Sequence, residues 1–122
     1  MANDMMTLEQ LKKVLVCVEE EATIASETFL KDELGGRDAF PCGFAWVNIL
    51  GFKGQKITGN TKMGKLLKEA GITQNYGDRK FQLWCPGRIG CQNVYVIEHG
   101  AEQAATVLAT AGFDIEVGSR WD

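Results

Sequence analysis

Apolar residues in the first third of the chain recur at alternating intervals of three and four positions. This period predicts an amphipathic helix over residues 7–34 with the a/d seam of a coiled coil. Thr7 and Gln10 have the spacing of a capping box, which satisfies free amide donors at a helix start. Gly35-Gly36 supplies the stop at the other end. The seam consists of Leu8, Leu11, Leu15, Val18, Ala22, Ala25 and Phe29.

A helix of this length forms a rod of about 40 Å, which is longer than the small domain that follows it. Its seam has two uses. The helix either packs across its own domain or pairs with the same helix of a second copy, and we expect the second, a homodimer. Several β-branched residues lower the helix propensity. A break between Ala22 and Ser26, giving two shorter helices, is therefore the alternative to one continuous rod.

The rest of the chain alternates strand and helix patterns. One run is apolar on both faces, as in a central strand, and others alternate as half-buried strands do. The two helical runs each stop at a glycine. The sequence therefore predicts an α+β fold, in which a long N-terminal helix precedes a small three- or four-stranded sheet with two helices. The expected strands are residues 43–50, 81–85, 94–97 and 113–117, and the expected helices are residues 61–70 and 101–111.

This pattern divides the chain into a helical arm, residues 1–36, and a small α+β domain, residues 41–122. Trp46 and Trp84 fall inside expected strands, so we place both in the core. No run of 18 apolar residues occurs, which excludes a membrane-spanning helix. The first four residues have neither the basic start nor the apolar core of a secretory signal. We therefore expect a cytoplasmic protein with no membrane partner.

Residue types that carry metal or catalytic chemistry are sparse. The cysteines are Cys17, Cys42, Cys85 and Cys91, and His99 is the only histidine. Tetrahedral zinc needs four nitrogen or sulfur ligands, and the closest cysteine pair is separated by five residues. We therefore predict no metal and no cofactor. A single histidine gives little basis for a catalytic triad, so a non-catalytic role is favoured over a hydrolase built on His99 and Cys91.

Charge is segregated along the chain. Residues 1–40 carry nine acids and four bases, residues 41–80 two acids and seven bases, and residues 81–122 five acids and two bases. The middle segment is therefore basic in a chain whose net charge is −3. Such a patch attracts phosphate and nucleic acid, although the chain as a whole is acidic. The anion-binding candidates are Lys53, Lys56, Lys62, Lys65 and Lys68.

Several short motifs occur together in the second part of the chain. They are Cys42-Gly43-Phe44-Ala45-Trp46-Val47, Tyr76-Gly77, an alanine-rich run ending in Ala111-Gly112, and Ser119-Arg120-Trp121-Asp122. With these motifs, residues 41–122 resemble a family of small tailed-bacteriophage proteins that carry no assigned function. Residues 86–91 depart from the family pattern. The resemblance implies a protein that acts in the cytoplasm of an infected bacterial host.

Two functions from different classes follow. The first is a non-catalytic phage accessory protein that binds and modulates or inhibits a host protein, such as a component of a defence system. Tryptophan and arginine commonly anchor protein interfaces, and the interface candidates are Tyr76, Arg79, Arg120 and Trp121. The alternative is a small nucleic-acid- or nucleotide-binding protein that uses the basic stretch from Lys53 to Lys80.

Overall fold

Strand β1 (Gly43–Phe52) is the centre of an antiparallel sheet in the computed structural model, which describes residues 6–35, 43–87 and 93–121. It pairs with β5 (Phe113–Trp121) on one side, with β4 (Phe81–Trp84) on the other, and with the short β2 (Gln55–Lys56) near its end. Strand β3 (Thr73–Gln74) pairs with β4. The α+β fold is as predicted. The five-stranded sheet exceeds the expected size because β2 and β3 are too short to show a period.

The N-terminal helix α1 (Leu8–Leu34) begins and ends where the sequence predicts. The Thr7 hydroxyl accepts from the Gln10 amide at 3.1 Å, and the Gln10 side chain accepts from the Thr7 amide at 2.8 Å. Gly35 is left-handed, with φ 60°, and its amide donates to the carbonyl of Leu30. The helix is continuous, so the alternative of a break between Ala22 and Ser26 is wrong.

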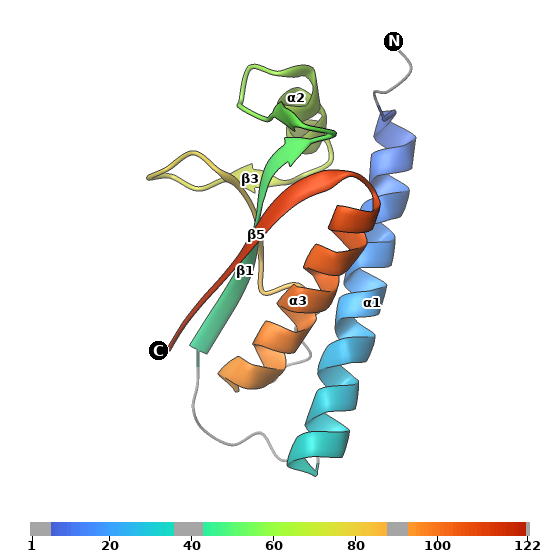
Figure 1. Cartoon of the computed structure of the whole chain (residues 1–122), viewed down its shortest axis with the longest axis vertical. Helices are drawn as coiled ribbons and strands as arrows, with labels where there is room; N and C mark the ends of the chain where they lie inside the picture. Colours follow the sequence, from blue (N-terminus) through green and yellow to red (C-terminus); the bar gives the residue numbers. More distant parts are fainter. Residues whose placement is uncertain (1–5, 36–42, 88–92, 122) are drawn as a thin grey trace.

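Helix α1 packs against α3 (Val94–Thr110) of the same chain, and the two run antiparallel side by side (Figure 1). Leu11, Val18 and Ala22 are fully buried there. Further along, the Ser26 hydroxyl donates to the carbonyl of Val96 at 3.4 Å. The seam is therefore used within the monomer, the first of its two predicted uses. The homodimer through this helix stays a prediction. The most apolar positions of the helix are already buried within the monomer.

The expected strand at residues 94–97 is wrong, because these residues form the first turn of α3. The Asn93 side chain accepts from the Tyr95 amide at 2.9 Å and caps the helix. Val94, Val96 and Ile97 are all buried in the first turns of the helix. A short apolar run that is buried on all sides does not distinguish a strand from a helix.

Among the described residues, the two long helices cover one face of the sheet and not the other. Ala45, Val47 and Ile49 of β1 are buried on the side where α3 packs across β1 and β5. The alternate residues of β1 point to the opposite side, and Figure 1 shows both long helices on a single side of β1 and β5. We call the uncovered side, which carries Phe44 and Trp46, the outer face. None of the helices within residues 6–35, 43–87 and 93–121 has the length and hydropathy of a membrane span.

Candidate functional site

Three aromatic side chains, Phe44, Trp46 and Trp84, form a cluster on the outer face, which we call the aromatic cluster. Trp46 and Trp84 are directly opposite each other on β1 and β4. Their rings are stacked, with centroids 5.3 Å apart and planes 4° from parallel. Phe44 lies 5.6 Å from Trp84 in a tilted arrangement. Trp84 is 50% exposed although it belongs to a strand, so one wall of the cluster is open to solvent.

Two residues of β5 complete the cluster. Gly118 is opposite Trp46, and a β-carbon at position 118 would lie 2.6 Å from two atoms of the indole ring. The missing side chain therefore lets Trp46 lie across β5. Arg120 is opposite Phe44, and its guanidinium carbon lies 5.5 Å from the centre of that ring. This contact leaves a cation at the end of the aromatic cluster.

A polar link lies next to the cluster on the outer face. The Asn48 amide donates to Glu116 Oε1 at 2.8 Å, and Lys80 Nζ contacts the same oxygen at 3.2 Å. The hydrogen bond from Asn48 lowers the pKa of the Glu116 carboxyl, and the hydrogen bond and charge of Lys80 lower it further. Glu116 therefore keeps its negative charge to a lower pH than an isolated glutamate, and Lys80 neutralises it.

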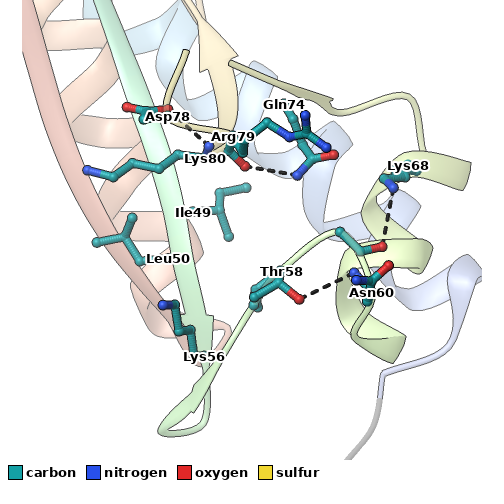
Figure 2. Close-up of a pocket in the computed structure, with 12 residues that line it drawn as sticks. Ile49, Leu50, Lys56, Thr58, Asn60, Lys68, Gln74, Asp78, Arg79 and Lys80 are labelled. Carbon is teal, nitrogen blue, oxygen red and sulfur yellow. Dashed lines mark hydrogen bonds between the residues drawn. The ribbon is translucent and has the colours of Figure 1, made fainter. Parts of the chain in front are cut away.

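Lys80 also lines a cavity of about 590 Å³, which we call the basic pocket. This volume is within the range of about 300–1,000 Å³ that is usual for small-molecule sites. Ile49 and Leu50, whose side chains lie on opposite sides of β1, both line it (Figure 2). Four cationic side chains and one acid line it, so its charge favours an anionic ligand. The charged residues are Lys56, Lys68, Arg79, Lys80 and Asp78.

One wall of the basic pocket is the loop that leads into α2 (Lys62–Glu69). The Thr61 hydroxyl accepts from the Gly64 amide at 3.1 Å and donates to the Thr58 carbonyl at 2.9 Å. Lys68 reaches back from α2 and donates to the carbonyl of Gly59 at 3.2 Å. The loop is therefore folded tightly over the helix start, which fixes the position of the lysine.

The opposite wall is the turn between β3 and β4. The Asn75 side chain accepts from the amides of Gly77 at 2.8 Å and Asp78 at 3.1 Å, and the Arg79 amide donates to the Asn75 carbonyl at 2.9 Å. Arg79 has φ 64°, a conformation that is uncommon outside glycine. Its carbonyl accepts from Gln74 at 2.9 Å. These bonds hold Arg79 in a strained conformation at the pocket.

The structure brings only some of the predicted anion-binding residues together. Lys56 and Lys68 line the basic pocket. Lys53 is in the β1–β2 turn, where its Nζ lies 5.5 Å from the ring centre of Phe52. Lys62 and Lys65 are exposed on α2, outside the set that lines the pocket. The lysines that are closest in sequence are therefore not the ones that converge.

The interface candidates are also separated. Arg79 lines the basic pocket, whereas Tyr76, in the same β3–β4 turn, is 93% exposed and is not among the lining residues. Arg120 contacts the aromatic cluster. The backbone of Trp121 pairs with Gly43, but its side chain and Asp122 lie outside the described residues. The sequence grouped Arg79 and Arg120 with a protein interface, and the fold places Arg79 at the basic pocket and Arg120 at the aromatic cluster.

Placing Trp46 and Trp84 in the core was wrong for Trp84 and incomplete for Trp46, which is partly exposed. A strand that is apolar on both sides does not show whether both sides are covered. Gly118 carries a signal that the sequence analysis did not use. A glycine within a strand often marks close approach by another group, here the Trp46 ring.

The remaining candidates for chemistry are dispersed. His99 stacks on Phe29 with ring centroids 4.0 Å apart, beside a shallow hollow between α1 and α3. Cys85 is buried and Cys17 is exposed, while Cys42 and Cys91 lie outside the described residues. Within the described ranges, no group of three or more histidine, cysteine, aspartate or glutamate side chains is placed to hold a metal ion. A His99–Cys91 hydrolase stays a prediction.

No protein-family model, curated protein or solved structure matches the chain. The resemblance to phage proteins stays a prediction.

Proposed function

We propose that this protein binds single-stranded nucleic acid on its outer face and that its role is binding rather than catalysis. One observation carries the proposal. The Asn48–Glu116–Lys80 contacts on the outer face connect the aromatic cluster to the basic pocket, because Lys80 also lines that pocket. This is the nucleic-acid alternative from the sequence, transferred from the lysines of α2 to a different set of residues.

The aromatic cluster suits unpaired bases. Base–aromatic stacking contributes about 1–3 kcal/mol per base and does not depend strongly on sequence. The exposed half of Trp84 offers a ring surface for one base, and Trp46 and Phe44 hold that ring in place. A duplex keeps its bases stacked inside, so the cluster favours single strands.

The basic pocket suits the phosphates of the same strand. Lys56, Lys68 and Arg79 extend along its lining, and none of them has a carboxylate partner within 4.0 Å among the described residues. Lys80 is neutralised by Glu116, and Asp78 accepts from the Lys80 amide at 3.0 Å. The net charge of the pocket is therefore positive, and Arg120 supplies a further cation at the other end of the cluster.

The test compares two lysines that the sequence treats alike. Lys56→Glu reverses a charge in the basic pocket, whereas Lys62→Glu reverses an exposed charge on α2 outside it. Binding is followed by the anisotropy of a labelled single-stranded oligothymidylate over a salt series. Each phosphate contact contributes about −0.7 to the slope of log K against log salt. The three pocket cations without a carboxylate partner therefore contribute about −2 to the slope.

We expect Lys56→Glu to weaken binding and to reduce the magnitude of the slope by about 0.7 or more, while Lys62→Glu leaves both near wild type. A duplex of the same length should bind more weakly than the single strand. Equal losses in the two variants would mean that the basic stretch acts only through its overall charge. Absence of binding at low salt would reject the proposal.

A second candidate is the phage accessory protein that binds and modulates a host protein. The observation that favours it is the exposed Trp84 beside Arg120, since tryptophan and arginine are frequent hot-spot residues. A host protein that is retained after nuclease treatment, and is lost with Trp84→Ala but not with Lys56→Glu, would support it. Under the first proposal, both substitutions reduce binding.

A further inference from the structure

Strand β5 forms an edge of the sheet. It pairs with β1 from Phe113 to Trp121, and no other strand of the described chain pairs with it. A nine-residue strand with a free side is a template for pairing with another chain. Natural proteins usually protect such an edge.

The hydrogen bonds of β1 indicate which residues of β5 face the free side. The Cys85 amide donates to the Ala45 carbonyl at 2.8 Å, so the backbone groups of Ala45 point toward β4. Directions alternate along an antiparallel strand, so those of Trp46 point toward β5, where Gly118 is its partner. The N–H and C=O groups of Gly118 therefore point toward β1. Every second residue of β5, starting from its neighbours, points toward the free side. These residues are Ile115, Val117 and Ser119.

We propose that β5 pairs with β5 of a second copy of this chain, antiparallel and centred on Val117. In this register Val117 faces Val117 of the second copy, and Ile115 faces Ser119, so all the free backbone groups are paired. Asp114 then faces Arg120 of the second copy, twice by symmetry. These ion pairs fall at non-hydrogen-bonded positions, where opposite side chains approach most closely.

Neighbouring registers are less favourable. A register centred on Ile115 places Asp114 opposite Glu116 of the second copy. A register centred on Glu116 places the two copies of that glutamate opposite each other. Both are unfavourable, because like charges at opposed positions are destabilising. A centre at Gly118 uses Glu116 to pair with Arg120, but Glu116 is already bound by Asn48 and Lys80. The centre at Val117 also covers a valine side chain that is 38% exposed in the monomer.

The pairing has a consequence for the outer face. Residues that oppose each other in an antiparallel pair point to the same side of the sheet, so the two-fold axis is perpendicular to the sheet. The two aromatic clusters then lie on one side of a continuous sheet, and a single strand that reached both would gain in avidity. This inference does not rest on the proposed function, since self-association is measured without nucleic acid.

Sedimentation velocity over a concentration series tests the pairing. We expect the wild-type chain to shift with concentration toward twice its mass of 13.4 kDa. Asp114→Arg should favour the monomer, because each new arginine would face Arg120 of the second copy, and the double variant Asp114→Arg/Arg120→Asp should restore the dimer. A wild-type monomer at every concentration would overturn the proposal. Failure of the double variant to restore the dimer would overturn the register.

A backbone variant provides an independent test. Val117→Pro removes an N–H that the fold directs to the free side, and proline is tolerated on edge strands with that orientation. Val117→Thr, the matched control, keeps the N–H. We expect the proline variant to be monomeric and the threonine variant to dimerise. A dimeric proline variant would overturn the proposal. If the proline variant does not fold, Asp114→Arg still tests the pairing, because Asp114 is exposed and its substitution does not disturb the core.

Discussion

Trp46 lies across β5 because the residue opposite it, Gly118, has no side chain. The position of this ring matters beyond its own packing, since it stacks on Trp84 and keeps that half-exposed ring in the plane that a base would use. A stacked aromatic pair of this kind contributes about 0.5–1.5 kcal/mol beyond the area that it buries. One glycine therefore determines the geometry of the aromatic cluster.

Gly118→Ala should displace the Trp46 ring, because the new β-carbon would lie 2.6 Å from the indole. The coupling between the stacked indoles should weaken, which circular dichroism detects as a reduced exciton couplet. Binding of single-stranded oligothymidylate should fall by about tenfold, the loss of about 1.4 kcal/mol of stacking. Gly77→Ala is the control, since its nearest neighbour is at an ordinary 3.4 Å. An unchanged couplet in Gly118→Ala would contradict this role.

The residues of the site were only partly predictable from sequence. Arg79 and Arg120 were chosen as interface anchors by residue type, and the fold places Arg79 at the basic pocket and Arg120 at the aromatic cluster. Trp84 was assigned to the core because it alternates within a strand. Its exposure depends on where the helices pack. Alternation identifies which residues share a face but not which face is covered.

At the scale of elements, α2 and the loop before it determine one side of the basic pocket. A β-carbon at Gly64 would lie only 1.8 Å from the carbonyl oxygen of Thr58. The loop approaches the helix this closely because the Thr61 hydroxyl bonds both to the Gly64 amide and to that carbonyl. The same approach brings Gly59 within reach of Lys68.

Gly64→Ala should therefore destabilise the protein and open the pocket wall. Inserting a methyl group where there is no space costs about 3 kcal/mol, which thermal unfolding measures as a fall in Tm of roughly 10 °C for a chain of this size. At temperatures below the unfolding transition, the affinity of this variant for oligothymidylate should also fall, because Lys68 loses its anchor. Gly77→Ala, which meets no close contact, should retain the wild-type Tm. A wild-type Tm in Gly64→Ala would show that the loop is not held as described.

The elements themselves differed in how well the sequence predicted them. Helix α1 was predicted to within one residue because it has three independent signals: its period, the Thr7–Gln10 capping box and Gly35. The start of α3 was missed because Val94–Ile97 has no period of its own and the cap, Asn93, comes just before an apolar run. Strands β2 and β3 exist only through pairing with β1 and β4, which local sequence does not record.

At the scale of the whole molecule, both long helices lie on one side of strands β1 and β5 (Figure 1). The basic segment, residues 41–80, pointed to an anion site in the correct half of the chain. Of the five candidate lysines, Lys56 and Lys68 reach the pocket, whereas Lys53 lies on a turn and Lys62 and Lys65 are exposed on α2. Convergence of Arg79 and Lys80 with them depends on the β3–β4 turn, a tertiary contact that charge counting does not predict.

The most direct test of the outer face is a titration of isotope-labelled protein with a short single-stranded oligothymidylate, followed by NMR. We expect the indole N–H signals of Trp46 and Trp84 to shift and to saturate together with the backbone amides of Arg79 and Lys80. The backbone amide signals of Lys62 and Lys65 should not shift. Saturable binding that moves the α2 signals while both indole signals remain still would contradict the account.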